Sequence, residues 1–115
     1  MISENEIIEY LEKEIPEFSI HENNSDKNVY TILNQFAMFT IRLIKNGNPV
    51  TLKKCFKSIN MLVKDGDKVT RNAASNVFLF SISCCIVCQA DQNQVLNLIG
   101  LPLRAEFNKL YYEKN

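Results

Sequence analysis

The fold of this chain is decided by residues 29–49, which read VYTILNQFAMFTIRLIKNGNP. Apolar side chains recur there at intervals of three or four residues, which is the period of an α-helix and not the alternation of a strand. The stretch closes on Gly47 and Pro49. A glycine in the left-handed conformation commonly ends a helix, and a proline commonly begins one. The stretch therefore predicts a long helix that ends near Lys45 and another that begins at Pro49.

The same helical period extends outward to both ends of the chain. We expect the first helix to begin at a capping box formed by Ser3 and Glu6. Ser25 or Asp26 could cap the long central helix. The expected helices cover approximately residues 4–14, 26–45, 49–64, 68–88, 91–99 and 102–112.

Little of the chain is available for long loops, because it holds only three glycines and three prolines. Short junctions between helices favour antiparallel neighbours. At 115 residues the chain has the size of one domain. The sequence therefore predicts an all-α fold, an antiparallel bundle of about five to six helices that forms a single domain over residues 1–115.

The fourth expected helix begins with basic and polar residues and is almost wholly apolar from Val77 to Val87. A helix that is apolar on all sides is usually central in its fold. This stretch is too short to span a membrane, which takes about 20 residues. The amino-terminal residues lack the basic and apolar regions of a signal peptide. We therefore expect a cytoplasmic protein without a membrane segment.

Two segments of the chain resemble each other. Residues 43–51 read LIKNGNPVT and residues 62–70 read LVKDGDKVT. Each is expected to end one helix and open the next. Junctions of this kind reuse the same residues, so we interpret the likeness as shared junction chemistry and not as a true repeat.

The four cysteines are expected to be structural. Three of them, Cys84, Cys85 and Cys88, lie close together on the fourth expected helix, where thiols make poor disulfide geometry. Without an export signal, free thiols are the default. Because apolar residues surround them, we expect these three to be buried, slow to label and not bound to zinc.

The sequence contains no evident catalytic set. The only histidine, His21, lies in a polar segment beside Glu22, away from the cysteines. We find no pair of carboxylates in an apolar context, and the lone glycines at 47 and 66 do not make a phosphate-binding loop. We therefore expect a protein that is not an enzyme and that uses no cofactor or metal.

Charge is sorted along the chain. The first 26 residues hold eight of the 13 acidic residues and one of the 13 basic ones, a net charge of 1 − 8 = −7. The rest of the chain carries 12 − 5 = +7. Such sorting bears on partners and not on fold. The basic middle offers an alternative role in nucleic-acid binding, but the pI of about 6.6 and the lack of aromatics among the lysines argue against it.

The candidate partner-binding residues fall into two groups of opposite charge. One group is the carboxylates of the amino-terminal segment, and the other is the lysines of the third expected helix. They are Glu6, Glu9, Glu12, Glu17 and Glu22, and Lys53, Lys54 and Lys57.

Three stretches carry a family resemblance. Residues 30–39 read YTILNQFAMF and lead on to Gly47, residues 52–56 read LKKCF, and residues 72–79 read NAASNVFL. This pattern of apolar spacing and junctions resembles small helical bacterial immunity proteins that are encoded beside polymorphic or contact-dependent toxins. These families share no active-site motif, so no residue role is carried over.

The resemblance implies an immunity protein that neutralises a cognate bacterial toxin, such as a nuclease, by direct protein contact. Immunity proteins against nucleases are often acidic overall, whereas this chain is neutral, which leaves only the amino-terminal segment to mimic nucleic acid. The alternative is a helical regulatory or nucleic-acid-associated protein that uses the basic middle segment.

Overall fold

Helices account for most of the computed structural model, which describes residues 2–18, 28–86 and 88–113. A 3-10 turn, η1 (Glu4–Glu6), leads into α1 (Ile7–Glu14). The central helices are α2 (Val29–Asn46) and α3 (Pro49–Asp65). One continuous helix follows, made of α4 (Lys68–Ala73), the π-helical turn η2 (Ala74–Leu79) and α5 (Phe80–Cys85). The last helices are α6 (Gln89–Leu98) and α7 (Leu101–Glu113). When α4, η2 and α5 are counted as one helix, the described part of the chain has six helices and no strand. The predicted all-α class is therefore confirmed.

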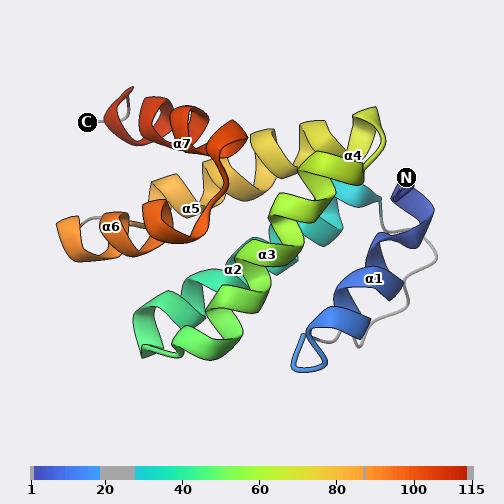
Figure 1. Ribbon diagram of the computed structural model, residues 1–115, viewed down its shortest axis with the longest axis horizontal. Helices are drawn as coiled ribbons and strands as arrows, with labels where there is room; N and C mark the ends of the chain where they lie inside the picture. The colour runs from blue at the N-terminus through green and yellow to red at the C-terminus, as the bar shows by residue number, and fades with distance from the viewer. Residues whose placement is uncertain (1, 19–27, 87, 114–115) are drawn as a thin grey trace.

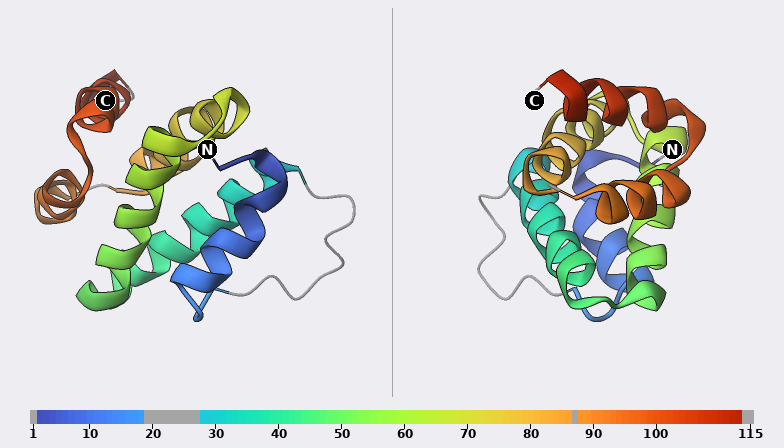
Figure 2. Two further views of the ribbon diagram at one scale, coloured as in Figure 1. Left: turned by 45° about the vertical axis from the view of Figure 1, so that its right-hand side comes forward. Right: turned by 90° about the vertical axis from the view of Figure 1, so that its left-hand side faces the viewer.

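Two helical hairpins organise the packing. Helices α2 and α3 run antiparallel, and the chain then reverses into α4–η2–α5, which packs across both of them (Figure 1). Helix α1 lies beside the α2–α3 hairpin, on the side away from α6 and α7 (Figures 1 and 2). Helix α7 packs on η2 and α5, and α6 packs on α3. The predicted antiparallel arrangement of sequential helices is therefore confirmed for α2, α3 and α4.

The core is built around a row of aromatic rings. Phe36 of α2 stacks on Phe78 of η2 with ring centres 5.5 Å apart, and Phe56 of α3 meets Phe78 edge-on at 5.9 Å. Phe18, in the segment after α1, lies edge-on against Phe36 at 5.0 Å. Aromatic pairs of this geometry stabilise a core beyond the area that they bury. They join α2, α3, η2 and the segment after α1 into one hydrophobic cluster.

Side-chain caps set the beginnings of three helices. The Thr31 amide donates to Asn28 Oδ1 at 3.0 Å, so α2 begins after Asn28. The expected caps of this helix, Ser25 and Asp26, lie outside the described residues. Asn48 caps α3 and Asp67 caps α4 in the same way. Gly47 ends α2 in the left-handed conformation, with φ of 71°, as predicted.

The two similar junctions differ in geometry. Gly66 has φ of −74°, so it does not adopt the left-handed conformation of Gly47. The amide of Ile2 donates to the Asp65 carbonyl at 2.7 Å, and the Asp67 amide donates to the Ile2 carbonyl at 2.9 Å. A Cβ at Gly66 would overlap the Leu62 carbonyl oxygen and lie 2.8 Å from Thr70 Cγ2. Gly66 is therefore required by space and Gly47 by its left-handed backbone, so the two junctions use the same residue for different physical reasons.

The fourth helix ends earlier than the sequence predicts. It stops at Cys85 and not at Cys88, because Ile86 is extended and Cys88 is the N-cap of α6. The next helix, expected to begin near residue 91, begins at Gln89, so Asp91 lies in the first turn of α6. The helix is central, as expected, but not buried all round, since Phe80 is 52% exposed. Among the described residues, no helix combines the length and the apolar character that crossing a membrane requires.

Candidate functional site

The acidic residues of the amino-terminal segment do not share one environment. Glu6 accepts hydrogen bonds from the Ser3 amide at 3.1 Å and from the Ser3 hydroxyl at 2.8 Å. These two bonds, the backbone one first, hold the pKa of Glu6 below its usual value. The predicted capping box is therefore confirmed, and Glu6 serves to start the first helix.

Glu17 links the acidic segment to the basic helix. Its carboxylate accepts a hydrogen bond from the Thr51 hydroxyl of α3 at 3.0 Å. The pKa of Glu17 is lowered by a hydrogen bond from its own backbone amide, then by Thr51, and to a smaller extent by the charge of Lys54. At this point the acidic segment lies against the basic one.

The other acidic candidates are scattered. Glu9 is exposed on α1, Glu12 is half-buried, and Glu22 lies outside the described residues. The structure therefore joins Glu17 to the α3 side of the molecule but does not gather the glutamates into one site.

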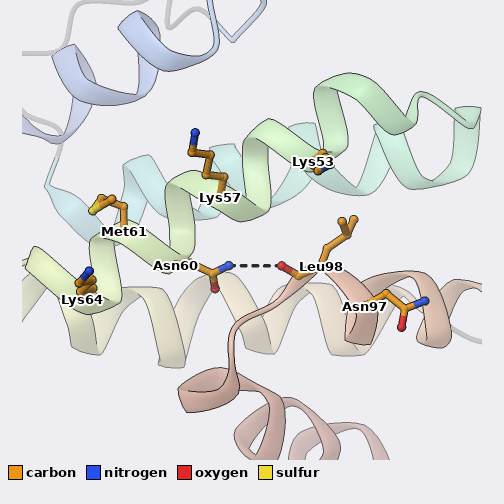
Figure 3. A pocket seen from close by; sticks show the side chains of 7 residues that line it. All are labelled: Lys53, Lys57, Asn60, Met61, Lys64, Asn97 and Leu98. Carbon is orange, nitrogen blue, oxygen red and sulfur yellow. Dashed lines mark hydrogen bonds between the residues drawn. The ribbon is translucent and has the colours of Figure 1, made fainter.

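The lysines of α3 border a surface groove. Lys53 and Lys57 lie one turn apart, and Asn60 and Lys64 continue the same stripe toward the end of the helix, whereas Lys54 does not line the groove. The first part of the groove has a volume of about 360 Å³ (Figure 3). Its lining residues are Lys53, Lys57, Asn60, Met61, Lys64, Asn97 and Leu98.

A second depression adjoins the first and shares Asn60 and Lys64 with it. Its volume is about 510 Å³. Its lining residues are Asn60, Val63, Lys64, Arg71, Gly100 and Leu103. We call the two depressions together the α3 groove.

Asn60 fixes the wall of the groove opposite α3. Its Nδ2 atom donates to the Leu98 carbonyl at 3.2 Å (Figure 3), and its Oδ1 atom accepts from the Gly100 amide at 2.8 Å. The Asn60 side chain thus provides a hydrogen-bond partner for both the Leu98 carbonyl and the Gly100 amide, which lie at the turn between α6 and α7. A Cβ at position 100 would lie 3.1 Å from Asn60 Oδ1, so the close approach favours glycine. The α6–α7 turn is consequently held against α3.

The charged side chains that line the α3 groove are all basic. They are Lys53, Lys57, Lys64 and Arg71, and no acidic side chain of the described residues lines either depression. Apolar side chains, among them Met61 and Val63, form much of the remaining surface. This arrangement suits an anionic ligand that also carries apolar groups.

Part of the groove was identifiable from the sequence. Lys53 and Lys57 were predicted as partner-binding residues, and Lys64 follows them at helical spacing. Arg71 and Asn60 could not be assigned, because their places in the groove depend on how α4 and the α6–α7 turn pack on α3.

The expectation that Cys84, Cys85 and Cys88 are buried is wrong. Cys84 and Cys88 are exposed and Cys85 is half-exposed, whereas the neighbouring side chains of Ile82, Ser83 and Ile86 are the ones that are buried. Cys55 alone is buried, and its burial raises the pKa of the thiol to about 12. No three metal-ligating side chains meet within the described part of the chain, although His21 lies outside it.

The fold and the groove together define a small all-helical domain with a basic surface groove. A family described as a domain of unknown function, DUF7674, matches residues 8–113, and the chain therefore belongs to this family. No curated protein and no solved structure matches the chain.

Proposed function

We propose that this protein is not an enzyme and acts by binding another protein through the α3 groove. The observation that carries the proposal is the charge of the groove, where Lys53, Lys57, Lys64 and Arg71 line two adjoining depressions without an acidic residue. Charge of one sign on a concave surface steers an oppositely charged partner and favours its orientation.

We further propose that the partner is a cognate bacterial toxin, so that the protein is an immunity protein that acts in the cytoplasm. The support for this finer proposal is the resemblance of the α2, α3 and η2 sequences to helical immunity proteins. An immunity protein needs only to cover or distort a toxin's working surface, which requires a stable contact and no catalytic group.

The test is co-expression with the product of the adjacent gene, which the proposal expects to contain a toxin-like domain. The proposal predicts that cells expressing that domain alone stop growing, that co-expression of this protein restores growth, and that the two proteins elute together in size-exclusion chromatography. Restored growth without a complex, or a complex without restored growth, would contradict neutralisation by direct contact.

A further inference from the structure

We infer that the α3 groove binds an acidic amphipathic helix, whose apolar side chains occupy the two depressions and whose carboxylates lie beside the basic rim. The inference rests on the proposed function for the identity of the partner. It goes beyond that function by specifying the chemical character of the partner segment that binds in the groove.

The α3 groove carries positive charge from its basic side chains. Lys53, Lys57 and Lys64 are exposed, and no described hydrogen bond or ion pair engages them or Arg71. Other basic side chains are used within the fold, since Lys45 donates to the Cys85 carbonyl and Arg104 donates to the Leu96 carbonyl. Among the described residues, the groove cations are thus available to carboxylates from outside.

Both depressions of the α3 groove also have an apolar lining. Met61 and Leu98 contribute to the first depression, and Val63 and Leu103 contribute to the second. A purely ionic ligand would leave this surface in water. A ligand with apolar side chains would bury it, which stabilises binding by about 25 cal/mol for each Å² of apolar area removed from water.

The span of the groove along α3 matches the length of a short helix. Lys53 and Lys64 lie eleven residues apart on α3, which corresponds to about 16 Å, or three turns, along a helix. Because the two depressions share Asn60 and Lys64, one ligand can occupy both. An amphipathic helix of about three turns matches this span, and a helix lying in an apolar groove is a recurrent mode of peptide recognition.

The wall of the groove is fixed by contacts within the fold. The two hydrogen bonds of Asn60 hold the α6–α7 turn against α3. A wall that is held in this way avoids part of the entropic cost of ordering on binding.

The experiment measures fluorescence anisotropy of a labelled helical peptide of about 12 residues, which is about three turns. One side of the peptide carries glutamates, and the other carries two leucines one turn apart. We expect saturable binding that the Lys57→Glu/Lys64→Glu double variant weakens at least about tenfold, because two attractions become repulsions. We also expect Met61→Ser to weaken binding several-fold. Lys109→Glu is the matched control, since Lys109 is an exposed lysine on α7 outside the groove.

Two comparison ligands separate the alternatives. If a peptide with serines in place of the leucines, or a single-stranded oligonucleotide of equal charge, binds as tightly as the acidic amphipathic peptide, the groove is a general polyanion surface and the inference is wrong. The inference is also wrong if the double variant binds the peptide as the native protein does. If the peptide binds but the toxin domain does not, the proposed function fails and the assignment of the groove stands. All variants are checked for unchanged thermal unfolding.

Discussion

Cys55 differs from the other three cysteines in the properties that govern thiol reactivity. It is fully buried, and burial raises the pKa of its thiol to about 12, so it stays protonated near neutral pH. Cys84 and Cys88 are exposed. We expect Cys84 and Cys88 to react readily with a maleimide in the native protein and Cys55 to react only after denaturation. Mass spectrometry of the labelled peptides identifies each site, and rapid native labelling of Cys55 would contradict the packing of α3.

The raised pKa of Cys55 also makes stability depend on alkaline pH. In the unfolded chain this thiol ionises near its usual pKa of 9, whereas in the folded protein it keeps its proton until about pH 12. Between these values the folded state binds more protons, so stability should fall by up to about 1.4 kcal/mol for each pH unit. Urea unfolding at several alkaline pH values should show a steeper decline for the native protein than for Cys55→Ala. Equal slopes would mean that this thiol does not contribute.

Gly47 and Gly66 are required for different physical reasons, and substitution can separate them. Gly47 is left-handed with open space around it, so Gly47→Ala should cost about 1–2 kcal/mol in the free energy of unfolding and Gly47→Asn should cost less. At Gly66 any Cβ overlaps its neighbours, so Gly66→Ala should cost about 1–3 kcal/mol and Gly66→Asn should bring no recovery. Chemical denaturation of the four variants provides the measurement. Recovery by asparagine at both positions would show that the junctions share one geometry.

At the scale of elements, a single side chain of α3, Asn60, makes two hydrogen bonds to the α6–α7 turn. Asn60→Ala removes the hydrogen bonds to the Leu98 carbonyl and the Gly100 amide. We expect this change to lower the free energy of unfolding by about 1–3 kcal/mol and to increase amide exchange in the turn. Asn60→Asp should recover part of the loss, because a carboxylate still accepts from Gly100 but cannot donate to Leu98. Hydrogen exchange detected by mass spectrometry tests both variants, and unchanged exchange at residues 98–100 would contradict the role given to Asn60.

The extents of the helices show what local sequence can predict. The first three helices and the last follow from apolar spacing and from caps within a few residues, and the structure has them near the predicted positions. The end of the fourth helix was missed because apolar residues continue through Ile86 and no glycine or proline marks the break. The π-helical turn η2 has no sequence signal of this kind either. It widens the helix where Phe78 packs between Phe36 and Phe56, a requirement of tertiary packing.

The candidate groove was predictable only in part for the same reason. Lys53 and Lys57 stand out as exposed charges on an amphipathic helix. The concave shape arises only when the α6–α7 turn docks on Asn60, a contact between residues about 40 positions apart in the chain. Local patterns therefore predict which side chains are exposed but not which of them border a common depression.

At the scale of the whole molecule, the opposite charges of the chain do not remain fully separate. Glu17 contacts Thr51 and lies near Lys54, so part of the acidic segment lies against the basic helix. The groove cations beyond this contact, from Lys57 to Arg71, remain directed to the surface. Under the proposed function, this distribution would direct an acidic partner toward the α3 groove.

The most direct test of the central claim is the association rate of the protein with the toxin domain that the proposed function expects the adjacent gene to encode, measured at low and at moderate salt. We predict that Lys57→Glu/Lys64→Glu slows association at least about tenfold at low salt and flattens its salt dependence, because rim charges act mainly on encounter. Lys109→Glu should associate as the native protein does. If the double variant keeps the native rate and salt dependence, the α3 groove is not the binding surface.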